Sequence, residues 1–290
     1  SNVGQKQNFA QSGDHTGPPA FWHKQTVTVT GEKGTQINMR ILAAKDYNHM
    51  SRQAANLISA QVILEPASVL GLATGSTPVG TYKQLIEWYK KGDVDFSSCK
   101  TVNLDEYVGL GRGDENSYDT FMWDNFFSHI HIAPENVHIP NGKNRDEADE
   151  CRHYDEVLAS LGHIDLQLLG LGHNGHIAFN EPGHDFTLGT HRVKLNESTI
   201  EANRRFFEKE EDVPRYAYTM GLKSILGADR ILLLVSGAEK AEILYRSLAG
   251  PITPEVPASI LQMHSDLVVV ADDAALSVIR EQAPQMMNKR

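Results

Sequence analysis

Three loops of this sequence gather the side chains that are suited to acid–base chemistry and to binding an anion. The segment from Gly170 to Gly183 holds an amide, an imidazole and a carboxylate close together, namely Asn174, His176 and Glu181. An imidazole with a nearby carboxylate can be held in one tautomer and can exchange a proton around neutral pH. A structural histidine is the alternative, but the flanking glycines and the following acid favour a reactive group.

The same loop contains Gly170, Gly172 and Gly175, which match the GxGxxG pattern of dinucleotide-binding proteins. In those proteins the glycines open a helix at the first strand–helix turn, whereas Pro182 and Gly183 would end a helix here at once. We therefore expect no nicotinamide cofactor. No other motif indicates a cofactor, and the sequence predicts none and no metal site.

A second candidate group is the acidic pair Asp105 and Glu106, which follows a short apolar run at residues 101–104. Neighbouring side chains along a strand point to opposite faces, so we expect only one of the two acids to face a cleft. An acid in that position can be a general base, a metal ligand or a helix cap, and the pair alone does not decide between these roles.

The third loop contains Gly75, Ser76 and Thr77 just before Pro78 and a predicted helix at 79–91. We expect Ser76 or Thr77 to cap that helix and Pro78 to be its first residue. The free amides and the dipole of such a helix start favour a phosphate group. No Lys follows Gly75, so the turn is not the phosphate loop of a nucleoside triphosphatase. An ordinary capped turn is the alternative.

Two cations are candidates to complete an anion pocket. Arg205 lies among apolar residues, and Lys240 follows one predicted strand and opens a helix. A guanidinium group binds phosphate through two parallel hydrogen bonds, and an ammonium group supplies a mobile charge. The alternative for each is a solvated surface cation.

The elements that must position these loops alternate along the chain. Continuously apolar runs predict strands at 69–73, 101–104, 164–169, 231–235 and 267–270, and helical periodicity predicts helices at 46–64, 79–91, 118–130, 145–161 and 239–248. Such strands are buried on both faces and are joined by helical crossovers. We expect an α/β fold with a single doubly wound, mainly parallel, Rossmann-like sheet and helices on both faces. All three loops would then lie at the carboxyl ends of strands, where such sheets bind ligands.

Composition limits the classes of partner. The 290 residues carry a formal net charge of −10, which disfavours nucleic acid and anionic membranes. The longest apolar runs have the length of strands, so no transmembrane span is expected. Cys99 and Cys151 lie far apart and form no CxxC pair, which fits a reduced cytoplasmic protein without disulfides or structural zinc.

Residues 1–38 are polar and lack helical periodicity, and the first Met of the chain is Met39. We expect residues 1–38 to be a disordered leader of the kind that translated vector sequence supplies, and residues 39–290 to form one domain. The alternative is a native extension in which residues 26–30 form an edge strand. A signal peptide is disfavoured, because there is no apolar core segment.

Taken together, five segments in this order resemble the glucosamine-6-phosphate deaminase family, also called glucosamine/galactosamine-6-phosphate isomerases: GLATGSTPVGTY, NLDEYVGL, GLGHNGHIAFNEPG, EANRRFF and SGAEKA. The resemblance implies a sugar-phosphate isomerase type of fold and a hydrolase that acts in amino-sugar (N-acetylglucosamine) catabolism in the cytoplasm. The implied reaction converts glucosamine 6-phosphate and water to fructose 6-phosphate and ammonia without a cofactor.

The resemblance also implies roles for individual residues. Asp105 is expected to move the proton between C2 and C1, and His176 to open the sugar ring with support from Glu181 and Asn174. Some family members have Asp where this chain has Asn174. The residues expected to bind the substrate phosphate are Gly75, Ser76, Thr77, Arg205 and Lys240.

Allosteric members of the family carry basic residues just after the catalytic loop. The corresponding stretch of this chain, Thr187 to Lys194, has Gly189, His191 and Val193 there. The resemblance therefore gives no support for activation by an acetylated sugar phosphate, and the sequence leaves open whether any allosteric activation exists.

Three alternatives remain at this point. The first is a deaminase for another hexosamine phosphate, such as galactosamine 6-phosphate. The second is a 6-phosphogluconolactonase-like hydrolase, against which NLDEYVGL argues. The third is a sugar-phosphate sensor, which would need a DNA-binding module that residues 1–38 are too short to form. The expected partner is a small sugar phosphate, and the sequence leaves open whether the chain is a monomer or a homo-oligomer.

Overall fold

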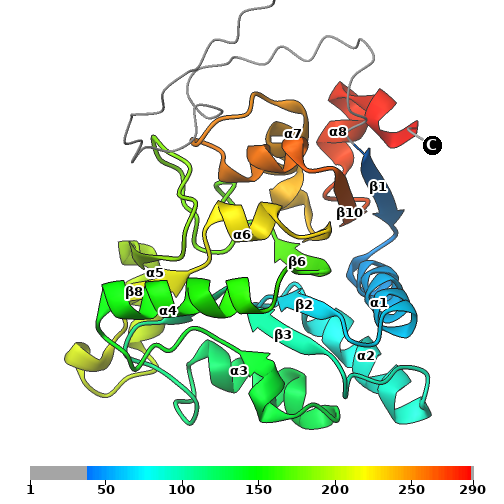
Figure 1. Ribbon diagram of the computed structural model, residues 1–290. Helices are drawn as coiled ribbons and strands as arrows, with labels where there is room; N and C mark the ends of the chain where they lie inside the picture. The colour runs from blue at the N-terminus through cyan, green and yellow to red at the C-terminus, as the bar shows by residue number, and fades with distance from the viewer. Residues whose placement is uncertain (1–37, 289–290) are drawn as a thin grey trace, which may run out of the picture. The chain divides into compact units, whose positions relative to one another are not determined.

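The structure is a computed structural model that describes residues 38–288 (Figure 1). The predicted leader and the alternative edge strand at residues 26–30 lie outside the described residues. Asn38, which we had assigned to the leader, is instead the first residue of strand β1.

The centre of the fold is a seven-stranded sheet in which every pairing is parallel. The strand order is β1-β10-β9-β6-β2-β3-β5. The strands are β1 (Asn38–Ala44), β2 (Val69–Leu72), β3 (Lys100–Asn103), β5 (Val137–His138), β6 (Leu166–Gly170), β9 (Arg230–Val235) and β10 (Asp266–Asp272). This sheet confirms the predicted doubly wound α/β fold, because buried strands such as β2 and β9 require cover on both faces.

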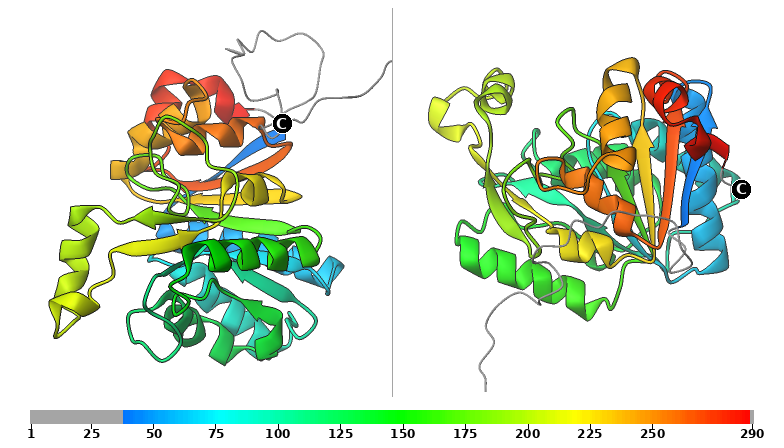
Figure 2. Two further views of the ribbon diagram at one scale, coloured as in Figure 1. Left: turned by 60° about the vertical axis from the view of Figure 1, so that its left-hand side comes forward. Right: turned by 90° about the horizontal axis from the view of Figure 1, so that it is seen from above.

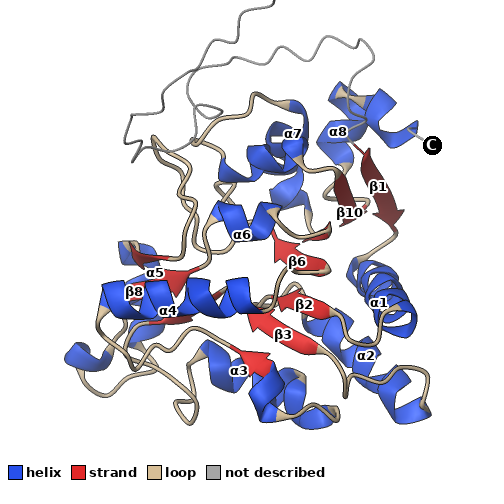
Figure 3. Ribbon diagram, viewed as in Figure 1, coloured by secondary structure: helices blue, strands red, loops and turns tan. Residues whose placement is uncertain are grey.

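Helices cover both faces of this sheet (Figures 1 and 3). One face packs against α1 (Tyr47–Leu64), α2 (Val79–Lys91) and α3 (Tyr118–Asn125) through an apolar cluster that includes Met50, Tyr82 and Phe126. The other face packs against α4 (Glu147–Ser160), α6 (Leu222–Leu226), α7 (Ala241–Ala249) and α8 (Ser277–Gln282). Short 3₁₀ helices complete the fold at Phe127–His129, Pro134–Asn136, Glu210–Asp212, Ala238–Lys240, Pro257–Met263 and Pro284–Asn288.

A second, antiparallel sheet was not predicted. It has the order β4-β8-β7 and consists of β4 (Asp105–Tyr107), β8 (Tyr216–Thr219) and β7 (His191–Lys194). These strands have only three or four residues, and β7 alternates between half-buried and exposed positions, so no continuous apolar run marks it. Between β7 and β8 lies a segment that we call the α5 arm (residues 195–215), which contains α5 (Glu197–Arg204) and projects from the main sheet (Figure 2).

Several predicted helix ends are shifted for local reasons. The helix predicted at 118–130 ends at Asn125, whose side-chain amide donates to the carbonyl of Phe121. The helix predicted at 145–161 begins at Glu147, because the Asp146 side chain accepts a hydrogen bond from the amide of Asp149. None of the helices between residues 38 and 288 is both long and apolar enough to cross a bilayer.

Candidate active site

The three predicted loops all lie at the carboxyl ends of strands of the parallel sheet. The turn after β2 contains Gly75, and the loop after β6 contains His176. Asp105 lies two residues after the end of β3. Lys240 lies a few residues after β9. Because β9, β6, β2 and β3 are neighbours in the sheet, one edge of the molecule presents all of these segments.

The ring of His176 is held by the two polar side chains predicted to support it. Its Nδ1 lies 2.6 Å from Oδ1 of Asn174 and 3.4 Å from Oε1 of Glu181. The amide nitrogen of Asn174 donates to Glu181 at 2.8 Å, so the amide oxygen is left to face the imidazole. Because that oxygen only accepts hydrogen bonds, Nδ1 carries the proton and Nε2 is the free base.

Burial lowers the pKa of His176, and it outweighs the upward effect of the Glu181 carboxylate, which is the second-largest cause. The charges of His173 and Lys240 lower this pKa a little further. The imidazole is therefore neutral at pH 7. An uncharged imidazole with a free nitrogen and a neighbouring carboxylate can take a proton from a bound hydroxyl group and return one.

The ring of His176 packs against the backbone at the start of its own loop. A Cβ on Gly172 would lie 2.2 Å from the imidazole of His176, so only glycine leaves room for the ring. Ala178 has a φ of 52°, the only left-handed value outside glycine among the described residues. Asn180 stabilises this turn by donating to the carbonyls of Ile177 and Met220. The loop opens no helix, so it lacks the structural context of a dinucleotide-binding GxGxxG motif.

A cavity of about 370 Å³ adjoins this loop. Asn174 and Glu181 line one side, and residues at the end of β7 and the start of the α5 arm line the other, including Lys194 and Asn196. This volume lies within the range of pockets that hold small molecules.

Asp105 and Glu106 point to opposite sides of β4, as expected from the alternation of a strand. The carboxylate of Glu106 accepts hydrogen bonds from the amides of Tyr107, Tyr118 and Asp119, each at 2.9 Å. That of Asp105 accepts none from the residues the structure describes, and its residue is 7% exposed. Burial, and then the charge of Glu106, raises the pKa of Asp105 to about 8. Asp105 is thus a free carboxyl group with a raised pKa at the edge of the sheet.

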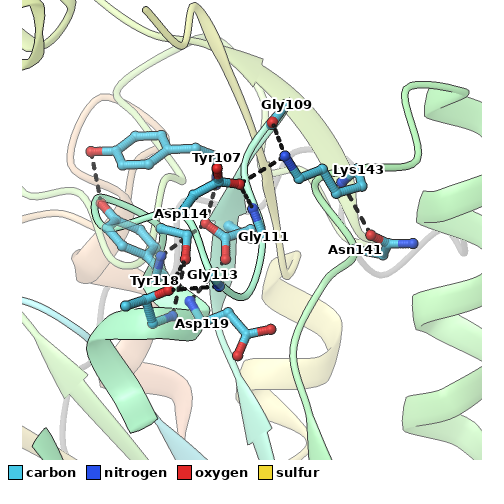
Figure 4. A network of polar contacts seen from close by, with 12 residues as sticks. Tyr107, Gly109, Gly111, Gly113, Asp114, Tyr118, Asp119, Asn141 and Lys143 are labelled. Carbon is cyan, nitrogen blue, oxygen red and sulfur yellow. Dashed lines mark hydrogen bonds and ion pairs between the residues drawn. The ribbon is translucent and has the colours of Figure 1, made fainter. Parts of the chain in front are cut away.

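The loop between β4 and α3 is held in place from outside (Figure 4). Asp114 accepts a hydrogen bond from the amide of Gly111 at 2.9 Å and forms an ion pair with Lys143 at 2.7 Å. Lys143 also donates to the carbonyl of Gly109 at 3.1 Å. These contacts fix the backbone of the loop that follows Asp105 and Glu106.

The turn after β2 differs from the prediction in one respect. Neither Ser76 nor Thr77 caps α2; Pro78 is the N-cap residue and makes no side-chain cap. The reason is that the Tyr47 hydroxyl supplies the cap: it accepts a hydrogen bond from the amide of Gly80, in the first turn of α2, at 2.9 Å. It also donates to the backbone carbonyls of Ser76 and Thr77, at 2.7 and 3.1 Å. Gly75 has a φ of 95° and is exposed. The turn thus leaves both hydroxyl groups available to a ligand.

Lys240 lies in the 3₁₀ turn that leads into α7, as predicted. Its Nζ donates to the carbonyl of Leu171 at 2.6 Å, which places the ammonium group beside the loop after β6. Burial lowers its pKa, against an upward effect of Glu239.

Arg205 is not brought to the other phosphate candidates. It is the C-cap residue that follows α5, it is exposed, and its guanidinium lies over the ring of Phe206 at 4.7 Å from the ring centroid. Within residues 38–288, no hydrogen bond or ion pair fixes the Arg205 side chain.

Sequence reasoning missed an aromatic group beside the acidic pair. Tyr107 and Tyr118 share a hydrogen bond between their hydroxyls at 3.2 Å, and the ring of Phe179 stacks on that of Tyr118. Asn203 of α5 donates to the Tyr107 hydroxyl at 3.4 Å. In the sequence, only the tyrosine of DEY and the helix-capping Ser117 before Tyr118 pointed to this aromatic group. The contact between Tyr107 and Tyr118 itself could not be predicted, because it depends on the antiparallel sheet.

In the described part of the chain, one group has metal-ligand spacing: His163, Asp165 and Asp229. These residues precede β6 and β9, so they lie at the amino ends of the strands, away from the loops above. They are not part of the candidate site.

The sequence matches the family described as glucosamine-6-phosphate isomerases/6-phosphogluconolactonase over residues 42–270. A glucosamine-6-phosphate deaminase of Lachnoclostridium phytofermentans is 60% identical over 232 residues, which are 80% of this chain and 98% of the relative. A glucosamine-6-phosphate deaminase of Clostridioides difficile is 53% identical over 239 residues, covering 82% of this chain and 96% of the relative.

Solved structures agree. A monomeric glucosamine-6-phosphate deaminase is 47% identical with a TM-score of 0.78, covering 83% of this chain and all of that one. A 6-phosphogluconolactonase of Trypanosoma brucei shares the fold at 17% identity and a TM-score of 0.65, covering 84% of this chain and 99% of that one. From the family match and the relatives that it covers almost end to end, the chain belongs to the glucosamine-6-phosphate isomerase/6-phosphogluconolactonase family.

Proposed function

We propose that this chain is an enzyme that converts glucosamine 6-phosphate and water to fructose 6-phosphate and ammonia, in the breakdown of amino sugars. Relatives at 60% and 53% identity carry the name of this activity. The observation that carries the proposal within the molecule is the neutral His176, held by Asn174 and Glu181 on the same sheet edge as the free carboxyl of Asp105.

The first step of the reaction is ring opening. A cyclic amino sugar has no acidic proton on C2 until O5 leaves C1. In the proposed role, Nε2 of His176 takes the proton of the O1 hydroxyl and a proton returns to O5 as the ring bond breaks. Asn174 fixes the tautomer that this step needs, and Glu181 stabilises the imidazolium that forms for a moment.

The second step is proton transfer between carbons. The Asp105 carboxylate takes the proton from C2, and the electron pair moves into the C1 carbonyl, whose oxygen receives a proton from the neighbouring ammonium group. Asp105 then returns its proton to C1 while the nitrogen lone pair forms the C2=N bond. Water then adds to C2 of the resulting imine, and ammonia leaves. A carboxyl group with a pKa raised to about 8 suits this task, because it must exist in both forms during one turnover. The ammonium group of the substrate favours the ionised form when it binds.

The phosphate group is held, in this proposal, by the turn that contains Gly75, Ser76 and Thr77, together with Lys240 and Arg205. Phosphate binding at the far end of the sugar orients the reacting carbons and can contribute several kcal/mol to catalysis. Arg205 reaches this group only if the α5 arm moves toward the sheet edge, so we propose that substrate binding draws the arm inward.

We further propose that the reaction takes place in the cytoplasm, in keeping with two buried, unpaired cysteines, Cys99 and Cys151. The division of the chain into a leader at 1–38 and a domain from 39 to 290 is also a proposal, moved by one residue because Asn38 belongs to β1.

The test is ammonia release by the purified chain from glucosamine 6-phosphate, with galactosamine 6-phosphate and 6-phosphogluconolactone as comparison substrates. We expect ammonia and fructose 6-phosphate from the first substrate. Ammonia from the galactosamine epimer alone would change the assigned substrate, and hydrolysis of the lactone without ammonia release would overturn the proposal.

A further inference from the structure

Glu106 is the most deeply buried carboxylate near the candidate site, and no step above uses it. It is 0% exposed, whereas Asp105 beside it is 7% exposed. A buried carboxylate is costly unless every lone pair direction finds a donor. Its function must therefore be sought in what its two oxygens contact.

Both oxygens bind backbone amides, and two of these amides belong to the first turn of α3. Oε1 accepts from Tyr107 and Tyr118, and Oε2 accepts from Asp119. The next amide of the turn, that of Thr120, is bound by the side chain of Ser117 at 3.0 Å. The free donors of this helix start are thus divided between Glu106 and Ser117. Burial raises the pKa of Glu106 to about 7, and the three amide donors act against this, so its pKa stays below that of Asp105 at about 8. Glu106 is therefore ionised in the pH range in which Asp105 titrates.

Among the residues that the structure describes, no cation contributes to the pKa of Asp105 or of Glu106. Tyr118 and Tyr154 face Asp105, and burial raises the pKa of both hydroxyls. The charge of Asp119, on α3, raises the pKa of Glu106. Arg112 lowers the pKa of Asp119. From the segment before α4, Gly142 comes so close that a Cβ there would lie 3.1 Å from Glu106 Cγ.

We propose, on the basis of the function proposed above, that Glu106 is the positioning residue of the active site: its ionised carboxylate ties β4 to the start of α3 and thereby fixes the Asp105 carboxyl at the sheet edge. The backbone of Asp105 is held on its other side by the pairing of β4 with β8, in which Asp105 is opposite Thr219. On the side of α3, the same backbone is held by the hydrogen bonds from Tyr118 and Asp119 to Glu106.

A second consequence follows from the sign of the charge. The negative charge of Glu106 contributes to the raised pKa of Asp105, after the larger effect of burial. Because the proposed base must be ionised to take the C2 proton, the charge of Glu106 contributes to the pH at which the acidic limb of kcat/KM falls. Removing the charge moves this limb to lower pH.

The experiment compares Glu106→Gln with Glu106→Asp and with Ser117→Ala. Gln removes the charge and turns an NH₂ toward one of the amides; Asp keeps the charge but is too short to reach α3. Ser117→Ala removes a contact from the same helix start without touching the acidic pair, so it is the matched control. We measure kcat, KM and the pH profile for glucosamine 6-phosphate, with Tm for each variant.

For Glu106→Gln we expect kcat to fall at least about tenfold with KM within about twofold, and the acidic limb to move down by up to about one pH unit. For Glu106→Asp we expect a similar fall in kcat with the limb near its parental position. Ser117→Ala is expected to lower Tm but to keep the parental limb and kcat within about twofold. If the Glu106→Gln variant does not fold, the comparison of kcat between Glu106→Asp and Ser117→Ala tests the inference instead.

A second readout separates this inference from the proposed function. The carboxyl carbon of Asp105, assigned by its loss in Asp105→Asn in protein labelled with ¹³C-aspartate, is titrated by NMR in the parent and in Glu106→Gln. Should the parent release no ammonia, the function fails, yet a lower Asp105 pKa in the variant still supports the role of Glu106. A folded Gln variant with parental kcat and limb, or a Ser117→Ala variant as impaired as Gln, overturns the inference.

Discussion

The loop that contains His176 and the α5 arm that contains Arg205 are held to the molecule in different ways. The loop is tied to the fold on several sides: Lys240 donates to its Leu171 carbonyl, Asn180 reaches the Met220 carbonyl, and Gly183 donates to Pro254. The ion pairs of the arm are internal, joining Arg204 to Glu201 and Glu210.

The arm meets the rest of the fold through a small apolar cluster around Tyr107, Ile200 and Val213, and through the long Asn203–Tyr107 hydrogen bond. The difference suggests a division of labour. The groups proposed for proton transfer are fixed before substrate arrives, and a group proposed for phosphate binding is brought in by the substrate. The following predictions test that division.

The largest effect is expected from Asp105→Asn. An amide cannot take the C2 proton, so turnover falls by about a thousandfold or more, whereas the phosphate contacts remain. The measurements are ammonia release and the binding of fructose 6-phosphate by calorimetry. A variant that keeps full ammonia release would remove Asp105 from the role of base.

His176→Gln is expected to slow turnover by about a hundredfold or more, because ring opening loses its proton acceptor. An open-chain alditol analogue of the substrate needs no ring opening. The variant should therefore favour this analogue over the cyclic sugar more strongly than the parent does, as measured by competition binding. An unchanged preference would contradict the ring-opening role.

Arg205→Ala tests the mobile side of the comparison. We expect KM to rise about tenfold with a much smaller change in kcat, because a phosphate contact of about 1.4 kcal/mol is lost. Arg215→Ala is the control, since Arg215 belongs to the same arm but is paired with Glu210 at 2.8 Å. Equal effects in the two variants would mean that Arg205 acts only through the stability of the arm.

The smallest effect concerns stability. The pKa of Asp105 is raised from 3.8 to about 8, so between these values the folded chain holds a proton that the unfolded chain has released. Stability therefore falls as pH rises through this window, and the effect is absent below pH 3.8. Asp105→Asn removes the penalty, and we expect its Tm to exceed the parental Tm by roughly 2–6 °C at pH 8 and to match it near pH 4.

Asp114→Asn is the control for this measurement, because Lys143 holds the pKa of Asp114 below its ordinary value. Its carboxylate favours the folded state near neutral pH, so this variant should gain nothing at pH 8. A gain of similar size in both variants would assign the effect to net charge and not to the burial of Asp105.

The parallel sheet could be predicted from sequence because its strands are continuously apolar and its helices are amphipathic. The same reasoning missed β4, β7 and β8, whose stability depends on pairing between segments far apart in the chain. Leu104 and Met220 illustrate this, since their backbones pair across more than a hundred residues.

The candidate site shows the same limit. The sequence was enough to predict that Asn174, His176 and Glu181 lie close together in one loop. The cap assigned to Ser76 or Thr77 was wrong, because the hydroxyl of Tyr47, from α1, accepts the hydrogen bond of the Gly80 amide at the start of α2. The position of Arg205 was also unreadable, since it depends on how the α5 arm packs.

One chain of hydrogen bonds links the two proposed proton-transfer groups. Asp105 pairs with β8 at Thr219, the Thr219 hydroxyl accepts from the amide of Phe179, and Asn180 binds the carbonyl of Met220. β8 therefore fixes the spacing between the proposed base, Asp105, and the imidazole of His176. As a result, an insertion has different effects in different segments of the chain. Extra residues in the exposed turn at 206–212 would lengthen only the arm. A single residue added within β8 would shift its register and separate the two groups, so evolution can vary chain length on one side of this strand but not within it.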